Sequence, residues 1–171
     1  MLFRSGLVPE ERRKEGLFCL ESVCFNLGIA SLKQWSRLSF LSPQKMAQNA
    51  RTQIQRLGIK TPSPRQRTEL LSGGNQQKVL ISKWLCCCPE VIIFDEPTRG
   101  IDVGAKAEIY KVMRQLADDG KVILMVSSEL PEIITVCDRI AVFCEGRLTQ
   151  ILTNRDDMSE EEIMAWALPQ E

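Results

Sequence analysis

The sequence contains no histidine among its 171 residues. Catalytic arrangements that pair histidine with serine or cysteine are therefore excluded, and general acid or base chemistry is left to carboxylates. Zinc sites that combine cysteine with histidine are excluded for the same reason.

Long apolar runs and an excess of charge are also missing. The longest apolar runs, such as "VILMV" at 122–126, are far shorter than the ~20 residues of a membrane-spanning helix. No charged and then apolar leader opens the sequence, so we expect neither a membrane span nor secretion. Lys and Arg together number 22, as do Asp and Glu, so no basic surface predicts a nucleic acid partner and no acidic tail predicts a basic one.

The cysteines form no pattern that predicts a disulfide framework or a metal site. Their number, seven, is odd, three are adjacent, and no pair has CxxC spacing. We expect free thiols that act as small buried hydrophobes in a reducing cytoplasm. They are Cys19, Cys24, Cys86, Cys87, Cys88, Cys137 and Cys144.

Residues from about 20 to 60 predict a small helical lobe. Residues 21–31 predict a short helix, and apolar residues recur at helical spacing from Ser42 to Leu57, before a natural stop at Gly58. Residues 32–41 have no clear period. A polar, proline-containing link at 60–67 follows the lobe.

The rest of the chain alternates between helix and strand signals. We expect helices at 75–85 and 105–116, strands at 91–95 and 121–126, a helix with Pro131 in its first turn, a hairpin of 139–144 and 147–152, and a helix after a Ser159 capping box. The apolar runs of the two strands are unbroken, which predicts cover on both faces. Strands that alternate with helices predict an α/β fold with a mainly parallel sheet.

Two consecutive carboxylates follow the first of these strands. Asp95 and Glu96 would emerge at the carboxyl end of a parallel strand, where open α/β sheets bind their ligands. There, one carboxylate can order Mg²⁺ and its waters while the other orients or deprotonates an attacking water in phosphoryl transfer. The alternative is that Asp-Glu-Pro simply ends a strand at the surface.

A second candidate lies at the start of the helix at 75–85. In "LSGG" at 71–74, Ser72 can form a hydrogen bond at the helix start, while Gly73 and Gly74 leave main-chain amides open to a ligand. The helix dipole favours an anion there. The alternative is an ordinary serine cap after a glycine turn. No GxxxxGK[ST] loop occurs in the chain to hold the rest of a nucleotide.

Taken together, these motifs resemble a known family. "LSGGNQQKV" at 71–79, "VIIFDEPTRGIDVGAK" at 91–106 and "VILMVSSELPE" at 122–132 resemble the ATP-binding domain of ABC transporters. The resemblance is greatest to the second of two tandem nucleotide-binding domains in the ATPase subunit of bacterial importers of ribose, galactose or allose. It covers nearly the whole chain, because "GLVPEERRKEGLF" at 6–18 resembles the stretch before the helical subdomain.

The resemblance implies a fold and a domain order. It implies an α/β fold, a truncated P-loop NTPase domain of the ABC type with a mainly parallel sheet and a small helical subdomain, and with the Walker A half missing. Residues 1–19 would be a remnant with a Q-loop-like segment, 20–67 the helical subdomain, and 68–171 the second half of the ATPase core with Walker B and the C-terminal hairpin and helix. "LFRS" at 2–5 is what a sequencing adapter encodes, so we hypothesise that residues 1–5 are artefactual and the gene model truncated.

The resemblance also implies nucleotide-binding residues. The segment from Leu71 to Gln77 matches the signature motif, in which Ser72, Gly73 and Gly74 would touch the γ-phosphate of ATP. The nucleotide-binding residues implied here are Leu71, Ser72, Gly73, Gly74, Asn75 and Gln76. The segment from Thr98 to Asp102 matches the D-loop, which runs along the dimer interface, and Asp102 is included among the nucleotide-binding residues.

Metal and catalytic residues are implied in the same way. Asp95 matches the Walker B aspartate near Mg²⁺, and Glu96 matches the catalytic glutamate that polarises water. Glu10 stands where these domains place a Q-loop glutamine that senses Mg²⁺, and Ser128 occupies the place of the catalytic switch histidine. A hydroxyl can hydrogen-bond a γ-phosphate but cannot carry the proton as histidine does, so we expect a weak site.

In ABC dimers, the signature motif of one domain closes over ATP held by the Walker A loop of the other. The resemblance therefore implies ATP and Mg²⁺ as cofactors, and a second nucleotide-binding domain in a head-to-tail dimer. It also implies a transmembrane sugar permease, an indirect link to a periplasmic sugar-binding protein, and a peripheral place on the cytoplasmic face of the bacterial inner membrane. ATP hydrolysis would drive sugar import in the full-length protein, and we expect this chain alone to be inactive.

Two other functions stay open. A non-catalytic structural or regulatory half-domain that docks on a permease or a partner ATPase would use the same motifs without hydrolysis. A soluble ABC ATPase that acts on nucleic acid is disfavoured by the balanced charge and by "TRGIDVGAK" at 98–106. The sequence does not identify the sugar.

Overall fold

The structure, a computed structural model, describes residues 5–37 and 40–168. It divides into two compact units, Met1–Val126 and Ser127–Glu171, which are described separately below. The proposed artefactual residues 1–4 lie outside the described part, whereas Ser5 begins the first strand and pairs with Val91.

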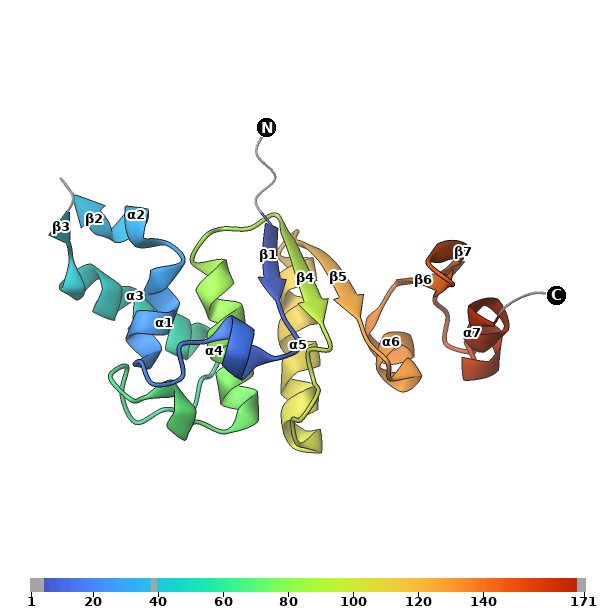
Figure 1. The fold of residues 1–171 in the computed structure, drawn as a ribbon, viewed down its shortest axis with the longest axis horizontal. Coiled ribbons are helices and arrows are strands. Elements are labelled where there is room, and N and C mark those ends of the chain that lie inside the picture. The colour runs from blue at the N-terminus through green and yellow to red at the C-terminus, as the bar shows by residue number, and fades with distance from the viewer. Residues whose placement is uncertain (1–4, 38–39, 169–171) are drawn as a thin grey trace. The chain divides into compact units, whose positions relative to one another are not determined.

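A three-stranded parallel sheet forms the centre of the first unit (Figure 1). Its strands are β1 (Ser5–Val8), β4 (Val91–Asp95) and β5 (Val122–Val126), in the order β1-β4-β5. The predicted α/β fold with a parallel sheet is confirmed. The sequence did not predict β1, because a strand of four residues has too short an alternation to be recognised before its partner is known.

Helices α4 (Gly73–Leu85) and α5 (Val103–Asp118) pack on this sheet and on each other. The sheet face that they cover carries Val8, Ile92 and Phe94, all fully buried. Before β4, Cys86–Glu90 form a turn, and Gly120 ends α5 at φ +83°, a conformation that glycine adopts without strain. The predicted helices at 75–85 and 105–116 are confirmed.

The opposite face of the sheet is open, which corrects the prediction that both strands are covered on both sides. Leu7, Val122, Leu124 and Val126 are 48–56% exposed, and the register places them on one face, with Leu7 opposite Ile93 and Ile93 opposite Leu124. An unbroken apolar run predicts contact on both faces, but whether a face is covered depends on chain segments distant in sequence.

The helical lobe consists of α1 (Val23–Ile29), α2 (Leu32–Trp35) and α3 (Pro43–Arg56), with β2 (Ser36–Arg37) and β3 (Phe40–Leu41) as a small hairpin. Side-chain oxygens of Ser22 and Ser42 cap α1 and α3. Helix α1 packs against both α3 and α4. The two helices predicted at 21–31 and 42–57 are confirmed, whereas the elements at 32–41 had no sequence signal.

Two short turns connect the lobe to the sheet. A π-helical turn, η1 (Arg12–Gly16), follows β1, and a 3₁₀ turn, η2 (Thr68–Leu70), precedes α4. The link at 60–67 forms no helix, and its last residue, Arg67, makes an isolated antiparallel bridge with Ser22. Among the described residues, no helix is long and apolar enough to cross a membrane.

The second unit contains α6 (Leu130–Val136), an antiparallel hairpin of β6 (Arg139–Cys144) and β7 (Arg147–Thr153), and α7 (Glu160–Ala167). Its core is formed by Ile140, Val142, Met158 and Ile163. At the hairpin turn, Glu145 and Gly146 have φ of +48° and +75°, which match the right-handed twist of the strands. The predicted hairpin and the predicted Ser159 cap are confirmed.

All seven cysteines are free, as predicted, but the expectation that they are buried is wrong for most of them. Only Cys86 is buried; Cys88 is exposed and the other five are half-buried. Cys86 ends α4, and Cys88 lies in the turn that follows, at φ +51°. The three adjacent cysteines therefore lie where the chain leaves the core at the end of α4. Composition alone does not predict where a buried helix ends, so it did not predict that Cys87 and Cys88 are less buried than Cys86.

Helices α4 and α5 lie in close contact at Gly74 and Ala105. A Cβ added at Gly74 would lie 2.6 Å from the Cβ of Ala105, a distance that neighbouring methyl groups do not tolerate. Gly74 is itself buried. The second glycine of "LSGG" therefore has a packing function within the chain, whatever ligand it also approaches.

We expect Gly74→Ala to destabilise the chain by about 1–3 kcal/mol, because the added methyl group overpacks the contact with Ala105. Urea unfolding followed by circular dichroism measures the change. Gly104→Ala is the matched control, since its Cβ would meet Asp102 Oδ1 at an ordinary 3.5 Å. Adding Ala105→Gly to Gly74→Ala should recover part of the loss. Equal stability of Gly74→Ala and the original chain would contradict this contact.

Candidate functional site

Asp95 and Glu96 lie at the carboxyl edge of the parallel sheet, where the sequence predicted them. Asp95 is the last residue of β4, the central strand, and is half-buried. Glu96 has φ +46°, a left-handed conformation that is uncommon outside glycine, and its backbone N–H donates to the Val126 carbonyl at 2.9 Å. Strained residues at such edges often mark functional sites.

Glu10 follows the neighbouring strand at the same edge. Val8 of β1 pairs with Phe94 of β4 in a parallel register, so the residues that follow both strands leave the sheet side by side. The Glu10 carboxylate forms an ion pair with the guanidinium of Arg99, in the loop after β4. The segments after β1 and β4 are therefore joined by a charged contact.

The predicted signature segment forms the start of α4. Ser72 occupies the N-cap position, but its side chain does not cap the backbone; instead its Oγ accepts a hydrogen bond from Asn75 Nδ2 at 2.9 Å. Asn75 Oδ1 in turn accepts from the Lys60 N–H at 2.7 Å. Ser72 is exposed, while Leu71 is buried. The helix start is thus placed as predicted, with the serine hydroxyl at the surface.

Gln76 is fully buried and shapes the loop before it. Its Nε2 donates to the carbonyl oxygens of Thr68 and Leu71, both at 3.1 Å. These bonds satisfy carbonyls that α4 itself cannot reach. The sequence assigned Gln76 to a nucleotide site. Its contacts within the chain also give it a structural role, because they hold Leu71 and the loop before it against α4.

The segment from Thr98 to Asp102 lies against the start of α4. A Cβ at Gly73 would stand 3.3 Å from the Gly100 carbonyl oxygen and 2.9 Å from Arg12 Nη2. Asp102 is the N-cap of α5, and its Oδ1 accepts from the Ala105 N–H at 2.9 Å. The structure therefore brings the predicted signature and D-loop segments together in one unit.

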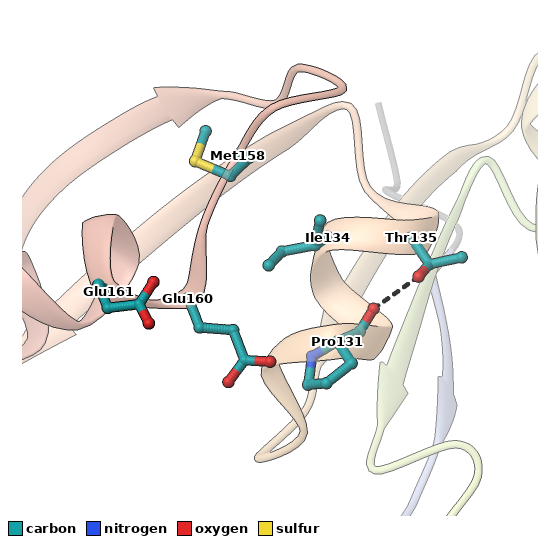
Figure 2. A pocket seen from close by; sticks show the side chains of 6 residues that line it. All are labelled: Pro131, Ile134, Thr135, Met158, Glu160 and Glu161. Atoms are coloured by element: carbon teal, nitrogen blue, oxygen red, sulfur yellow. Dashed lines mark hydrogen bonds between the residues drawn. The ribbon is translucent and has the colours of Figure 1, made fainter.

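Ser128 belongs to the second unit, in the exposed turn between β5 and α6. The same unit carries a pocket of about 450 Å³, lined in part by Glu160 and Glu161. Figure 2 shows Glu160 extending toward Pro131, with Glu161 farther from it, and the Pro131 carbonyl accepts from Thr135 Oγ1 at 2.7 Å. No residue that the sequence assigned to the site lines this pocket.

Within the described ranges, no three cysteine, aspartate or glutamate side chains converge as a ready cation site. Mg²⁺ needs no such cluster when it is held by one or two carboxylates, waters and substrate phosphates. Asp95 at the sheet edge fits such a role by position and chemistry. Glu10 fits less well, since Arg99 already engages its carboxylate.

The sequence did not identify Arg12 and Arg13, which contact the site segments. Arg12 donates to the carbonyls of Arg99 and Gly100 at 2.9 and 3.2 Å, and Arg13 Nε donates to Gln76 Oε1 at 3.1 Å. Their only sequence signal is a run of charges at 10–15, which is more often a solvated surface.

An ion pair also joins α4 to α5, about one helical turn after the signature segment. Lys78 is nearly buried, and its Nζ lies 2.6 Å from Glu108 Oε2 of α5 and 3.2 Å from the Gly58 carbonyl oxygen. The hydrogen bond and charge of Lys78 lower the pKa of the Glu108 carboxyl, and Lys60 adds to this effect. The pair ties α4 to α5 one turn below the signature segment.

The family model described as ABC transporter matches residues 5–99. The chain belongs to the ABC transporter family. The match includes the signature segment at the start of α4 and the carboxylates Asp95 and Glu96 at the end of β4, two regions that the sequence motifs indicated.

Curated relatives are longer than this chain. It is 70% identical to the D-allose import ATP-binding protein AlsA of Escherichia coli (strain K12), over 96% of this chain and 33% of the relative. It is 48% identical to the ribose import ATP-binding protein RbsA of Rhodopirellula baltica, over 96% of this chain and 32% of the relative. It is also 48% identical to the arabinose import ATP-binding protein AraG of Paraburkholderia xenovorans, over 98% of this chain and 33% of the relative. The chain thus spans about a third of the length of the curated relatives it matches.

A solved structure confirms the fold. A dimeric post-hydrolysis state of the ATP-binding cassette MJ0796 bound to ADP and Pi superposes with a TM-score of 0.70. The superposition covers 88% of this chain and 63% of that chain, at 21% sequence identity. The α/β fold of the ABC type that the motifs implied is therefore correct.

We expect Glu108→Gln to destabilise the chain at pH 7 by about 0.5–1 kcal/mol, a small loss because the carboxylate is half-exposed and screened by solvent. The pKa of Glu108 is lowered in the folded state, so its contribution is present above the unfolded pKa of about 4.3 and is lost as pH falls through the lower folded value. Urea unfolding at pH 7 and pH 3 should therefore give a smaller difference between the variant and the original chain at pH 3 than at pH 7.

The matched control for this prediction is Glu90→Gln, at an exposed position before β4. It should leave the free energy of unfolding nearly unchanged at both pH values. A Glu108→Gln deficit that persists undiminished at pH 3 would contradict a contribution from the ionised carboxylate.

Proposed function

We propose that this chain is part of the ATP-binding subunit of a bacterial ABC importer for a sugar, and that it contributes the signature motif and the Walker B carboxylates to a composite ATP site. The observation that carries the proposal is the 70% identity to a D-allose import ATP-binding protein over 96% of the chain. Identity of this degree extends over both site segments, which lie in one compact unit.

The proposed roles follow the geometry. At the start of α4, Ser72 offers an exposed hydroxyl and Gly73 a main-chain N–H to the γ-phosphate of an ATP held by a partner domain. Leu71, Gly74 and Gln76 keep this segment in place through burial and hydrogen bonds, and Asn75 holds Ser72 through its side-chain amide. Asp102, as the N-cap of α5, fixes the end of the loop beside them.

At the carboxyl edge, Glu96 would orient and deprotonate the attacking water, and Asp95 would hold Mg²⁺ through its waters. When bound, Mg²⁺ neutralises charge that develops on the phosphate oxygens. Glu10 would act beside this site from its ion pair with Arg99. Ser128 can donate a hydrogen bond to the γ-phosphate but cannot accept a second proton as histidine does, so we expect slow hydrolysis.

The wider assembly belongs to the same proposal. The chain would act with a second nucleotide-binding domain in a head-to-tail dimer and with a transmembrane sugar permease, at the cytoplasmic face of the inner membrane. Residues 1–19 would contain the Q-loop-like segment, 20–67 the helical subdomain, and 68–171 the second half of the ATPase core. A periplasmic sugar-binding protein would act indirectly through the permease.

A hybrid protein tests the proposal. The third of the E. coli D-allose import ATP-binding protein that matches this chain is replaced by residues 6–168, and ATP hydrolysis and growth on D-allose are measured in a strain that lacks the native protein. We expect both to be restored. Absence of growth from a well-expressed hybrid would overturn the proposal. Glu96→Gln in the hybrid should slow hydrolysis, whereas an unchanged rate would favour the non-catalytic alternative.

Ser72→Ala separates binding from stability. Because the Ser72 hydroxyl does not cap the α4 backbone, its loss should change the free energy of unfolding by less than about 0.5 kcal/mol. In the hybrid it should lower ATP turnover by about tenfold, the effect of one lost hydrogen bond to a charged group.

Ser159→Ala is the matched control, and it should behave in the opposite way. The Ser159 Oγ accepts from the Glu162 N–H at 3.2 Å, so its loss should cost about 1 kcal/mol of stability and leave ATP turnover unchanged. Equal losses of stability and turnover in both variants would contradict a ligand contact at Ser72.

A further inference from the structure

The side chain of Arg12 joins two segments that belong to different motifs. Its Nη1 donates to the Arg99 carbonyl at 2.9 Å and its Nη2 donates to the Gly100 carbonyl at 3.2 Å. The same Nη2 lies 2.9 Å from the position that a Cβ of Gly73 would occupy. One guanidinium therefore contacts both the loop after β4 and the start of α4.

The contact at Gly73 requires the absence of a side chain. A methyl group there would collide with Arg12 Nη2 and crowd the Gly100 carbonyl oxygen, at 2.9 and 3.3 Å. Gly100 itself has φ +66°, a conformation that glycine adopts without strain. Gly73 thus leaves room for the guanidinium, whereas Gly100 allows the backbone conformation of the loop whose carbonyl the guanidinium reaches.

The guanidinium is held there at a cost. Arg12 Nε is buried and makes no hydrogen bond within the described residues, and an unsatisfied buried donor is unfavourable. Burial lowers the pKa of Arg12, and the neighbouring charge of Arg13 adds to the effect. The bonds to the two loop carbonyls must offset these costs for the side chain to stay in place.

Neighbours of Arg12 attach the same stretch of chain to the same two segments. The Glu10 carboxylate pairs with Arg99 in the loop. On the other side, Arg13 Nε donates to Gln76 Oε1 in the first turns of α4, at 3.1 Å. The residues on either side of Arg12 therefore contact the same two segments that Arg12 contacts: Glu10 binds the loop after β4, and Arg13 binds α4.

The next turn of chain rests on the middle of α4. A Cβ at Gly16 would lie 2.7 Å from Leu80 Cδ2, and Lys83 Nζ donates to the Gly16 carbonyl at 2.8 Å. Residues 10–16 are consequently fixed to α4 at several points along its length, which makes them a firm base for the Arg12 side chain.

We propose that Arg12 is a positioning residue that couples the loop of residues 98–102 to the signature segment 71–74 within one cassette. This inference rests on the proposed function, because those segments are the ones that would face the ATP of the partner domain. A guanidinium can donate to two successive carbonyls in a fixed geometry, whereas the ammonium of lysine is a point charge on a flexible stem. The loop therefore cannot shift without disturbing the start of α4.

Hydrogen exchange of the 171-residue chain, measured by mass spectrometry, tests the coupling. Arg12→Ala should raise exchange at residues 73–76 and 99–102 together, by about ten- to a hundredfold, as expected for lost hydrogen bonds from a charged donor. Arg12→Lys should give a similar rise, because one ammonium cannot replace the two fixed donors. Lys14→Ala is the matched control, since Lys14 is a neighbouring cation that pairs with Glu11 at the surface, at 2.7 Å.

Unchanged exchange at either segment would overturn the coupling. A rise that extends equally to α3 would reveal a general loss of stability and would also overturn it. These outcomes do not depend on whether the chain takes part in ATP hydrolysis.

In the hybrid importer subunit, Arg12→Ala and Arg12→Lys should lower kcat by about tenfold and change the KM for ATP by less than about twofold, because they disturb alignment rather than ATP binding by the partner. Raised exchange with an unchanged kcat would overturn the positioning role. A hybrid that is inactive with Arg12 in place would refute the proposed function, and hydrogen exchange would still decide the coupling.

Discussion

The burial of α4 is the constraint on which the rest of the first unit depends. The helix packs against β1, α1, α5 and η1, and its surface is buried from Gln76 to Ser82. Several of these residues are polar, and contacts with neighbouring segments satisfy Gln76 and Lys78 among them. Gln76 is bonded to the η2 loop, and Lys78 to α5 and to the end of the helical lobe. The start of α4 is therefore positioned by contacts along the whole helix.

This constraint changes the meaning of the glycine pair. From the sequence, a motif with two glycines suggests either close approach by a ligand or an ordinary serine cap after a glycine turn. In the folded chain, Gly74 allows α5 to approach through Ala105, and Gly73 leaves space for Arg12 and the Gly100 carbonyl. The pair is thus required by the chain's own packing, and any phosphate would approach a helix start that is already fixed.

Local patterns predicted most elements correctly because those elements carry their own signals. The periodicity and the cap of α3, the apolar run of β4 and the turn at Gly146 are all readable within a few residues. The strand β1, the turn η1 and the contacts of Arg12 are not, since each depends on a partner more than 60 residues away in sequence, as with Arg12 and Arg99. Asp95 and Glu96 could be placed because a strand end defines a sheet edge, whereas the ion pair of Glu10 with Arg99 could not.

The open face of the sheet was not predicted for the same reason, because whether a sheet face is covered depends on segments distant in sequence. Leu7, Val122, Leu124 and Val126 have the composition of a buried layer, yet about half of each side chain is exposed. Covering this face would bury apolar area without touching α4 or α5, which lie on the other side. Since the signature segment and the loop of residues 98–102 are held from the α4 side, through Arg12, Gln76 and Lys78, their arrangement is independent of what covers the open face. A cassette built in this way keeps the start of α4 and the loop of residues 98–102 on one packed layer, and the open face of the sheet can vary without disturbing that layer.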